Sequence, residues 1–177
     1  TRFSTVFGSG TGSPDISPTA FLVNDCRKIF ISGWGGVTNE IDTYQTAFST
    51  ANSNTIFTPI YSNNYLSGNT INMPVTNDAF QKTSSGSGFY FAIFQPEASS
   101  LAYATHFAGS VNSREHVDGG TSRFDKKGVI YQSVCASCGR LETDNFPTTP
   151  GSWSNRDNSD NCNNAAIKFD LGKVIAK

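Results

Sequence analysis

A histidine and a carboxylate two residues apart form the one cluster in this sequence that resembles catalytic chemistry. His116 and Asp118 are followed by two glycines and preceded by Arg114 and Glu115. A carboxylate beside an imidazole can orient a general base or help to bind a metal ion. No serine nucleophile elbow, HExxH motif or paired-carboxylate motif supports either role. The simpler interpretation is a polar turn leading into the next strand, and we predict no catalytic residue, cofactor or metal.

Four cysteines, at positions 26, 135, 138 and 162, are the other reactive group. Cys135 and Cys138 have the CxxC spacing of a redox motif or of half a zinc site. A redox motif lies at a helix N-terminus, whereas this pair follows an expected strand. Adding Cys162 and His116 gives a spacing that matches no zinc finger or ribbon. We predict a disulfide, either Cys138–Cys162 or Cys135–Cys162, which would contribute about 3 kcal/mol, while Cys26 stays free or pairs outside the chain.

Aromatic residues in a long polar segment are the candidates for ligand binding. The segment 37–72 is rich in Thr, Asn, Ser and Tyr, and its charged residues are Glu40 and Asp42. Aromatic rings among amides and hydroxyls suit contact with a glycan or a protein. The candidates are Trp34, Tyr44, Tyr61 and Tyr65, together with His116 and Asp118. The alternative is a surface loop that packs its own aromatics; for Trp34 and Trp153, packing between sheets is the simpler interpretation.

An internal repeat indicates which elements position these residues. Residues Ser4–Gly8 resemble Ala104–Ala108 at a separation of 100, and the same register aligns Asp25 with Asp125. A second register aligns Met73–Phe80 with Phe146–Trp153, 73 residues further on, and Phe91–Phe94 with Ala166–Phe169. The separation shrinks because the first copy carries the insertion at 37–72. We therefore divide the chain into an outer strand at 1–8, a first unit at 17–107 and a second unit at 118–177.

Each unit contains four short strand candidates separated by turn residues. In the first unit they are Thr19–Asn24, Ile29–Trp34, Phe89–Phe94 and Leu101–Phe107. In the second they are Thr121–Phe124, Val129–Val134, Ala165–Phe169 and Lys173–Ala176. Arg2–Phe7 is predicted to be the fourth strand of a further unit, and the first three strands of that unit do not precede it in this sequence. Glycine and proline interrupt nearly every window that might be helical.

Repeated units of four antiparallel strands predict an all-β fold of β-propeller-like blades. One such sheet cannot bury both faces and must stack against a neighbour. Two units and an orphan strand are fewer than the roughly 4–8 blades of a closed propeller. The remaining blades then lie outside this chain, the units stack as an open array, or other chains complete the sheets at both termini.

The composition excludes several classes of protein. The 177 residues have room for one domain, and a net charge of −1 with 15% charged residues argues against nucleic-acid binding. No apolar run approaches the roughly 20 residues of a membrane span. The aromatic content of 12% argues against a disordered chain. An even number of cysteines in a lysine-poor chain indicates an oxidising, extracellular setting.

Several motifs together resemble a known family. The segments Asp125–Tyr131, Phe146–Trp153, Asn164–Asp170 and Leu101–Phe107 resemble the bacterial SBBP-type repeat of seven-bladed β-propellers. The segments Phe7–Phe21, Ile31–Gly36 and His116–Asp125 are similar to a narrower group, the large gliding-associated surface proteins secreted by the type IX pathway, which often carry PKD-type domains. The resemblance covers the chain except the insertion. It implies a secreted, multidomain parent at the outer cell surface and carries over no catalytic residues.

The expected function is therefore a non-enzymatic surface module for adhesion or scaffolding. Its rigid repeats would display loop sites for a protein or glycan ligand, and multiplicity would raise avidity. One alternative is a structural subunit of an extracellular filament or sheath, completed by strands from neighbouring chains. Another is a glycan-active enzyme domain that uses the loop 108–120.

Overall fold

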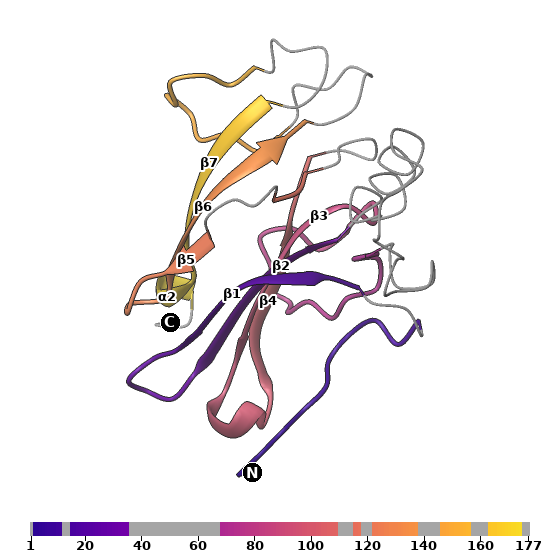
Figure 1. Cartoon of the computed structure of the whole chain (residues 1–177), viewed down its shortest axis with the longest axis vertical. Coiled ribbons are helices and arrows are strands. Elements are labelled where there is room, and N and C mark those ends of the chain that lie inside the picture. The colour runs from indigo at the N-terminus through magenta and orange to yellow at the C-terminus, as the bar shows by residue number, and fades with distance from the viewer. Residues whose placement is uncertain are drawn as a thin grey trace, which may run out of the picture.

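Two antiparallel sheets make up the fold, as the computed structural model in Figure 1 shows. The structure describes residues 2–11, 15–35, 68–109, 115–117, 122–137, 146–156 and 163–174. The helical segments in these residues are η3 (Pro96–Ala98) and α2 (Leu171–Val174). Neither is long enough to cross a membrane. The prediction of an all-β chain is confirmed.

The first sheet is a meander in which consecutive strands lie side by side, in the order β1-β2-β3-β4. Its strands are β1 (Ser17–Val23), β2 (Ile29–Gly35), β3 (Gly88–Phe94) and β4 (Leu101–Phe107). The second sheet has the order β5-β6-β7, with strands β5 (Ser122–Phe124), β6 (Val129–Ala136) and β7 (Asn163–Asp170). All seven begin and end within two residues of the predicted bounds.

The main hydrophobic core lies between the two sheets. Side chains of a strand alternate between its faces, so Phe91 and Ile93 of β3 point towards the second sheet and meet Ile130 and Ile167 there. We call this side of β1–β4 the inner face of the first sheet. A buried glutamine also joins the sheets, because Gln132 Nε2 donates to Ser32 Oγ at 2.9 Å.

The opposite side of β1–β4, the outer face of the first sheet, holds a second core. It is built from Ile29 of β2, from Tyr90, Ala92 and Phe94 of β3, and from Ala104 of β4. Phe7 packs against it, with its ring centroid 5.2 Å from that of Phe94. The second sheet and the N-terminal residues therefore lie on opposite sides of the first sheet (Figure 1).

The two hairpins of the repeat are anchored in the same way. The amide of Lys28 donates to Oδ1 of Asn24 at 3.0 Å, and the amide of Val129 donates to Oδ1 of Asp125 at 3.0 Å. The backbone bond from residue 24 to residue 28 recurs from residue 125 to residue 129. Asn24 thus corresponds to Asp125, a separation of 101. The predicted separation of 100, which paired Asp25 with Asp125, is wrong for this hairpin.

This one-residue correction decides which faces of the sheets correspond, because a slip of one residue exchanges the two faces of a strand. Ile29 now corresponds to Ile130, and their ladder partners, Phe94 and Phe169, correspond to each other. The predicted alignment of Phe91–Phe94 with Ala166–Phe169 is thereby confirmed. One side of the second sheet therefore corresponds to the outer face of the first sheet. That side is the one that packs on the inner face of the first sheet. The sheets stack facing the same way, although propeller-like blades are not confirmed.

The predicted fourth strand of the second unit differs from the structure. Residues 171–174 form helix α2 instead of beginning a strand at Lys173, and Leu171 is fully buried in the main core. Burial of Leu171 directly after β7 turns the chain inward, so the strand cannot continue along the sheet. Arg2–Phe7 also forms no strand. Residues 175–177 lie outside the described residues.

His106 of β4 gives the fold a pH dependence. Its side chain is buried on the outer face of the first sheet, 5.7 Å from the Tyr90 ring, and burial lowers the pKa of His106 from 6.5 to about 4. Between these values the unfolded chain binds more protons than the folded one. We therefore expect stability to fall by about 3 kcal/mol as the pH drops from about 6.5 to about 4.

Denaturant unfolding at neutral and acid pH measures this effect, with His106→Phe as the control. The variant should lose less stability on acidification than the original chain. An equal loss in the two proteins would contradict the assignment to His106.

Candidate functional site

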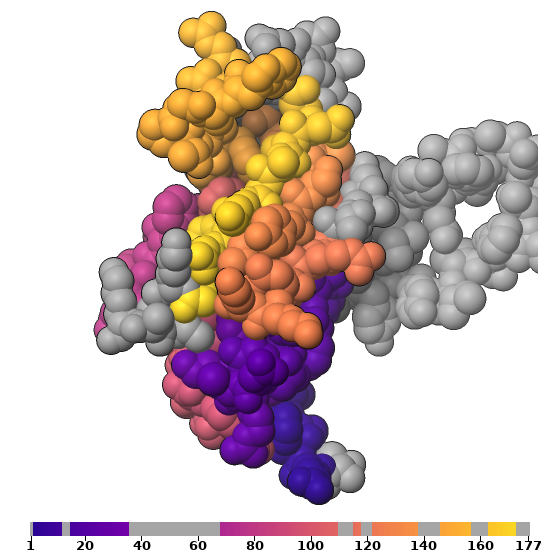
Figure 2. Space-filling view, turned by 90° about the vertical axis from the view of Figure 1, so that its left-hand side faces the viewer, coloured from indigo at the N-terminus to yellow at the C-terminus, as the bar shows by residue number. Residues whose placement is uncertain are grey.

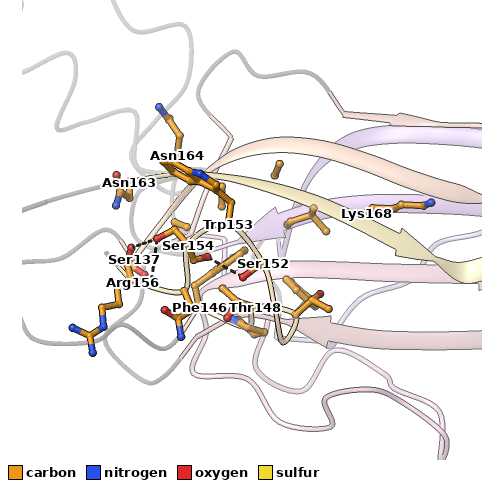
Figure 3. A pocket seen from close by; sticks show the side chains of 18 of the residues that line it. Ser137, Phe146, Thr148, Ser152, Trp153, Ser154, Arg156, Asn163, Asn164 and Lys168 are labelled. Carbon is orange, nitrogen blue, oxygen red and sulfur yellow. Dashed lines mark hydrogen bonds between the residues drawn. The ribbon is translucent and has the colours of Figure 1, made fainter. Parts of the chain in front are cut away.

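A groove with a volume of about 910 Å³ runs along β7 and is the candidate functional site. One wall is β7, from Asn163 to Phe169, and the opposite wall is the segment 146–156 (Figure 3). Among the described residues, β7 pairs only with β6, so its other edge faces the groove. Eight residues of β7 offer about 26 Å of strand edge.

The base of the groove is a cluster of phenylalanines. Phe107 lies 5.7 Å from Phe169 and 5.7 Å from Phe146, in edge-to-face contacts that favour aromatic rings. Phe80 stacks on Phe107 at 5.7 Å and is 61% exposed. The groove therefore offers an apolar floor that is partly open to solvent.

The rim of the groove is polar and carries an exposed tryptophan. Trp153 is 101% exposed, and both it and Asn164 line the groove (Figure 3). Other rim residues carry hydroxyl or amide groups: Thr148, Ser152, Ser154, Asn155 and Asn163. The charged residues among the described lining are Arg156 and Lys168, and both are cations.

The segment 146–156 repeats a segment of the first unit that borders β4. The amide of Ala79 donates to the carbonyl of Thr76 at 3.1 Å, and the amide of Ser152 donates to that of Thr149 at 3.0 Å. The two turns lie 73 residues apart in the sequence, which is the separation that the repeat predicted. In the first unit, Thr76 also exchanges hydrogen bonds with the backbone of Ala104 in β4.

The groove therefore occupies the position that β4 occupies in the first unit. There, β4 lies between β3 and the segment 73–81, and it bonds to both. In the second unit, β7 corresponds to β3 and the segment 146–154 corresponds to 73–81. The space between these two is the groove, and it has the outline of a missing strand.

Two of the predicted ligand-binding residues lie together, away from the groove. Trp34 is 8% exposed in the main core, and its ring is 5.8 Å from that of His116. The backbone of His116 pairs with that of Cys135 in an antiparallel bridge. Buried Glu115 accepts a hydrogen bond from the amide of Gly109 at 3.0 Å. This arrangement gives Trp34 and His116 a packing environment, while ligand contact by either stays a prediction.

The other predicted site residues lie outside the described part of the chain: Tyr44, Tyr61, Tyr65, Asp118, Cys138 and Cys162. The predicted disulfides therefore stay predictions. Cys135 is half-buried, and Cys26 is an exposed free thiol in the β1–β2 turn. Within the described residues, no three His, Cys, Asp or Glu side chains gather in a way that could hold a metal ion.

The groove residues were not predicted as a site. Trp153 was interpreted as packing between sheets, which is wrong because its side chain is fully exposed. A signal was nevertheless present, since the segment 146–153 aligns with 73–80, and Phe80 and Trp153 take equivalent positions in the two copies. Both of these aromatic residues line the groove.

No protein-family model, curated protein or solved structure matches this chain. The resemblance to the SBBP-type repeat accordingly stays a prediction.

Proposed function

We propose that this chain is a non-enzymatic scaffolding module of an extracellular or cell-surface assembly, and that it binds an extended polypeptide strand in the groove along β7. The observation that carries the proposal is the position of the groove, which is where the first unit has β4. An open strand edge can accept a further strand through main-chain hydrogen bonds. The phenylalanine floor would bury apolar side chains of that strand.

The extracellular setting of this proposal is supported by composition. The four cysteines are an even number in a chain with few lysines, which fits an oxidising, extracellular setting. Rigid sheets that hold a strand in a fixed register suit a scaffold, because main-chain bonds give affinity without demanding one side-chain sequence.

A peptide with the sequence of β4, residues 101–107, tests this function. We expect it to bind and to slow hydrogen exchange of the β7 amides at least tenfold, because exchange-competent groups at the edge become paired. NMR of the labelled chain measures both the exchange and the shift of the Trp153 indole signal. The control peptide carries proline at the position of Ala104, which removes a donor and blocks pairing. Equal effects of the two peptides, or none, would contradict the proposal.

A glycan-binding adhesion module is the second candidate, and the complete exposure of Trp153 favours it. An indole face can stack on a sugar ring, and amide groups nearby can bond its hydroxyls. Arg156 on the rim favours a ligand with negative charge.

The test compares Trp153→Ala with Tyr131→Ala, an aromatic residue that is 44% exposed on the far side of the second sheet. With uronic-acid oligosaccharides as probes, calorimetry should show at least tenfold weaker binding for Trp153→Ala only. Loss in both variants, or in neither, would rule against glycan stacking in the groove.

A further inference from the structure

We propose that the strand filling the groove is Arg2–Phe7 of a second copy of this chain, so that copies assemble head to tail. This inference rests on the proposed strand-accepting function. The partner is a second copy of the chain, because Arg2–Phe7 has the sequence of a strand of this kind and pairs with no strand in the structure.

The sequence of this segment matches the strand that the groove lacks. Ser4–Phe7 reads S-T-V-F, and the corresponding part of β4, Ala104–Phe107, reads A-T-H-F. Residues 2–7 belong to no strand in the structure, and Phe3 and Val6 are 46% and 96% exposed. Among the described residues, the second unit thus has a strand position that no strand fills, and the N-terminal segment is a predicted strand that pairs with no sheet.

A repeated ring contact places Phe7, the last residue of this segment, in a suitable position. Phe107 of β4 packs on Phe169 of the second sheet with ring centroids 5.7 Å apart, and Phe7 packs on Phe94 at 5.2 Å. Phe7 corresponds to Phe107, and Phe94 corresponds to Phe169. Phe7 therefore packs on the outer face of the first sheet as Phe107 packs on the second sheet, and Arg2–Val6 before it are exposed.

A second copy can reach this segment from solvent, because Arg2–Val6 are exposed. When its second sheet stacks on the outer face of the first copy's first sheet, its groove meets Arg2–Phe7. Phe7 keeps its contact with Phe94 while the backbone of the segment pairs with β7 of the second copy. The internal stacking of the two sheets is thereby continued between molecules, as a head-to-tail interface that can propagate.

The two surfaces that would meet are compatible in character. On the outer face of the first sheet, Phe21 and Val23 are 68% and 49% exposed, next to the second core. The far side of the second sheet, turned towards the viewer in Figure 2, carries Tyr131, Ala166 and Lys168. Lys168 lies over the Tyr131 ring at 5.9 Å, so its aliphatic stem can cover apolar surface. This mixture suits a reversible interface better than a permanent one.

Sedimentation of the full chain over a range of concentrations tests the assembly, with Thr5→Pro and Thr5→Ala as matched variants. The proline removes a backbone donor in the middle of the exposed segment, whereas the alanine keeps it. We expect the original chain to associate, Thr5→Pro to raise the dissociation constant at least tenfold, and Thr5→Ala to change it less than twofold. The Thr5→Pro chain keeps its own groove, so it should still bind a peptide of residues 1–9.

Each other result overturns this inference. A chain that stays monomeric at millimolar concentration excludes a second copy. Association that is unchanged in Thr5→Pro excludes strand pairing. If the β4 peptide binds and the 1–9 peptide does not, the proposed function survives and this inference fails; if neither binds, both fail.

Discussion

Replacing Phe91 by alanine is expected to lower the free energy of unfolding by about 3–5 kcal/mol. Phe91 is fully buried between the sheets, and its ring lies 5.3 Å from that of Phe169 and 6.2 Å from that of Phe107. Its removal would leave a cavity in the core that joins the two sheets. Urea unfolding with linear extrapolation measures the loss.

The control for this prediction is Phe21→Ala on the opposite side of the first sheet. Phe21 is 68% exposed, so its truncation should cost less than about 1 kcal/mol. Similar losses for the two variants would contradict the placement of the core between the sheets.

Replacing Gly88 by alanine is expected to cost about 2–5 kcal/mol, from two causes. Gly88 begins β3 with a φ of 103°, which residues with a side chain rarely adopt. A Cβ at this position would also overlap the Cβ of Ala108 beyond the end of β4. Thermal unfolding measures the effect as a lower Tm.

Gly10→Ala separates the two causes. Gly10 has a φ of 81°, but nothing lies within 4 Å of a Cβ placed there. This variant should lose only the backbone contribution, about 1 kcal/mol. A loss at residue 10 as large as at residue 88 would show that the contact with Ala108 is unimportant.

The strands could be predicted from the sequence because each is a short apolar run between turn residues. Leu101–Phe107 was predicted with the bounds that the structure has, and Phe89–Phe94 began one residue late. The fourth strand at Lys173–Ala176 was wrong because repeat symmetry was extended past the point where Leu171 is drawn into the core.

The register of the hairpins could not be fixed from sequence identity. Asp25 and Asp125 are identical, and aligning them was the natural choice. The residue that anchors each turn accepts, through its side chain, a hydrogen bond from the backbone amide of the first residue after the turn. Asn and Asp perform this role equally well. Asn24 is therefore the counterpart of Asp125, and the identity of Asp25 with Asp125 is incidental.

The candidate site could not be predicted, because it is defined by a position beside β7 that no described strand fills. The sequence shows the two walls of the groove as separate segments, and only the fold brings β7 opposite 146–156. Trp153 follows a Pro-rich stretch that aligns with a segment bordering β4 in the first unit, but no described strand lies in that position beside Trp153. Trp34, which sequence could not separate from a ligand contact, is buried by the second sheet.

The groove and the outer face both depend on which side of the second sheet faces the first. Proton–proton NOEs between aromatic and methyl groups measure this directly. We expect contacts of Ile130 and Ile167 with Phe30 and Phe91, and none from Tyr131 to those rings. Contacts from Tyr131 to Phe30 or Phe91, with Ile130 on the far side, would mean that the sheets face each other the other way and would contradict this expectation.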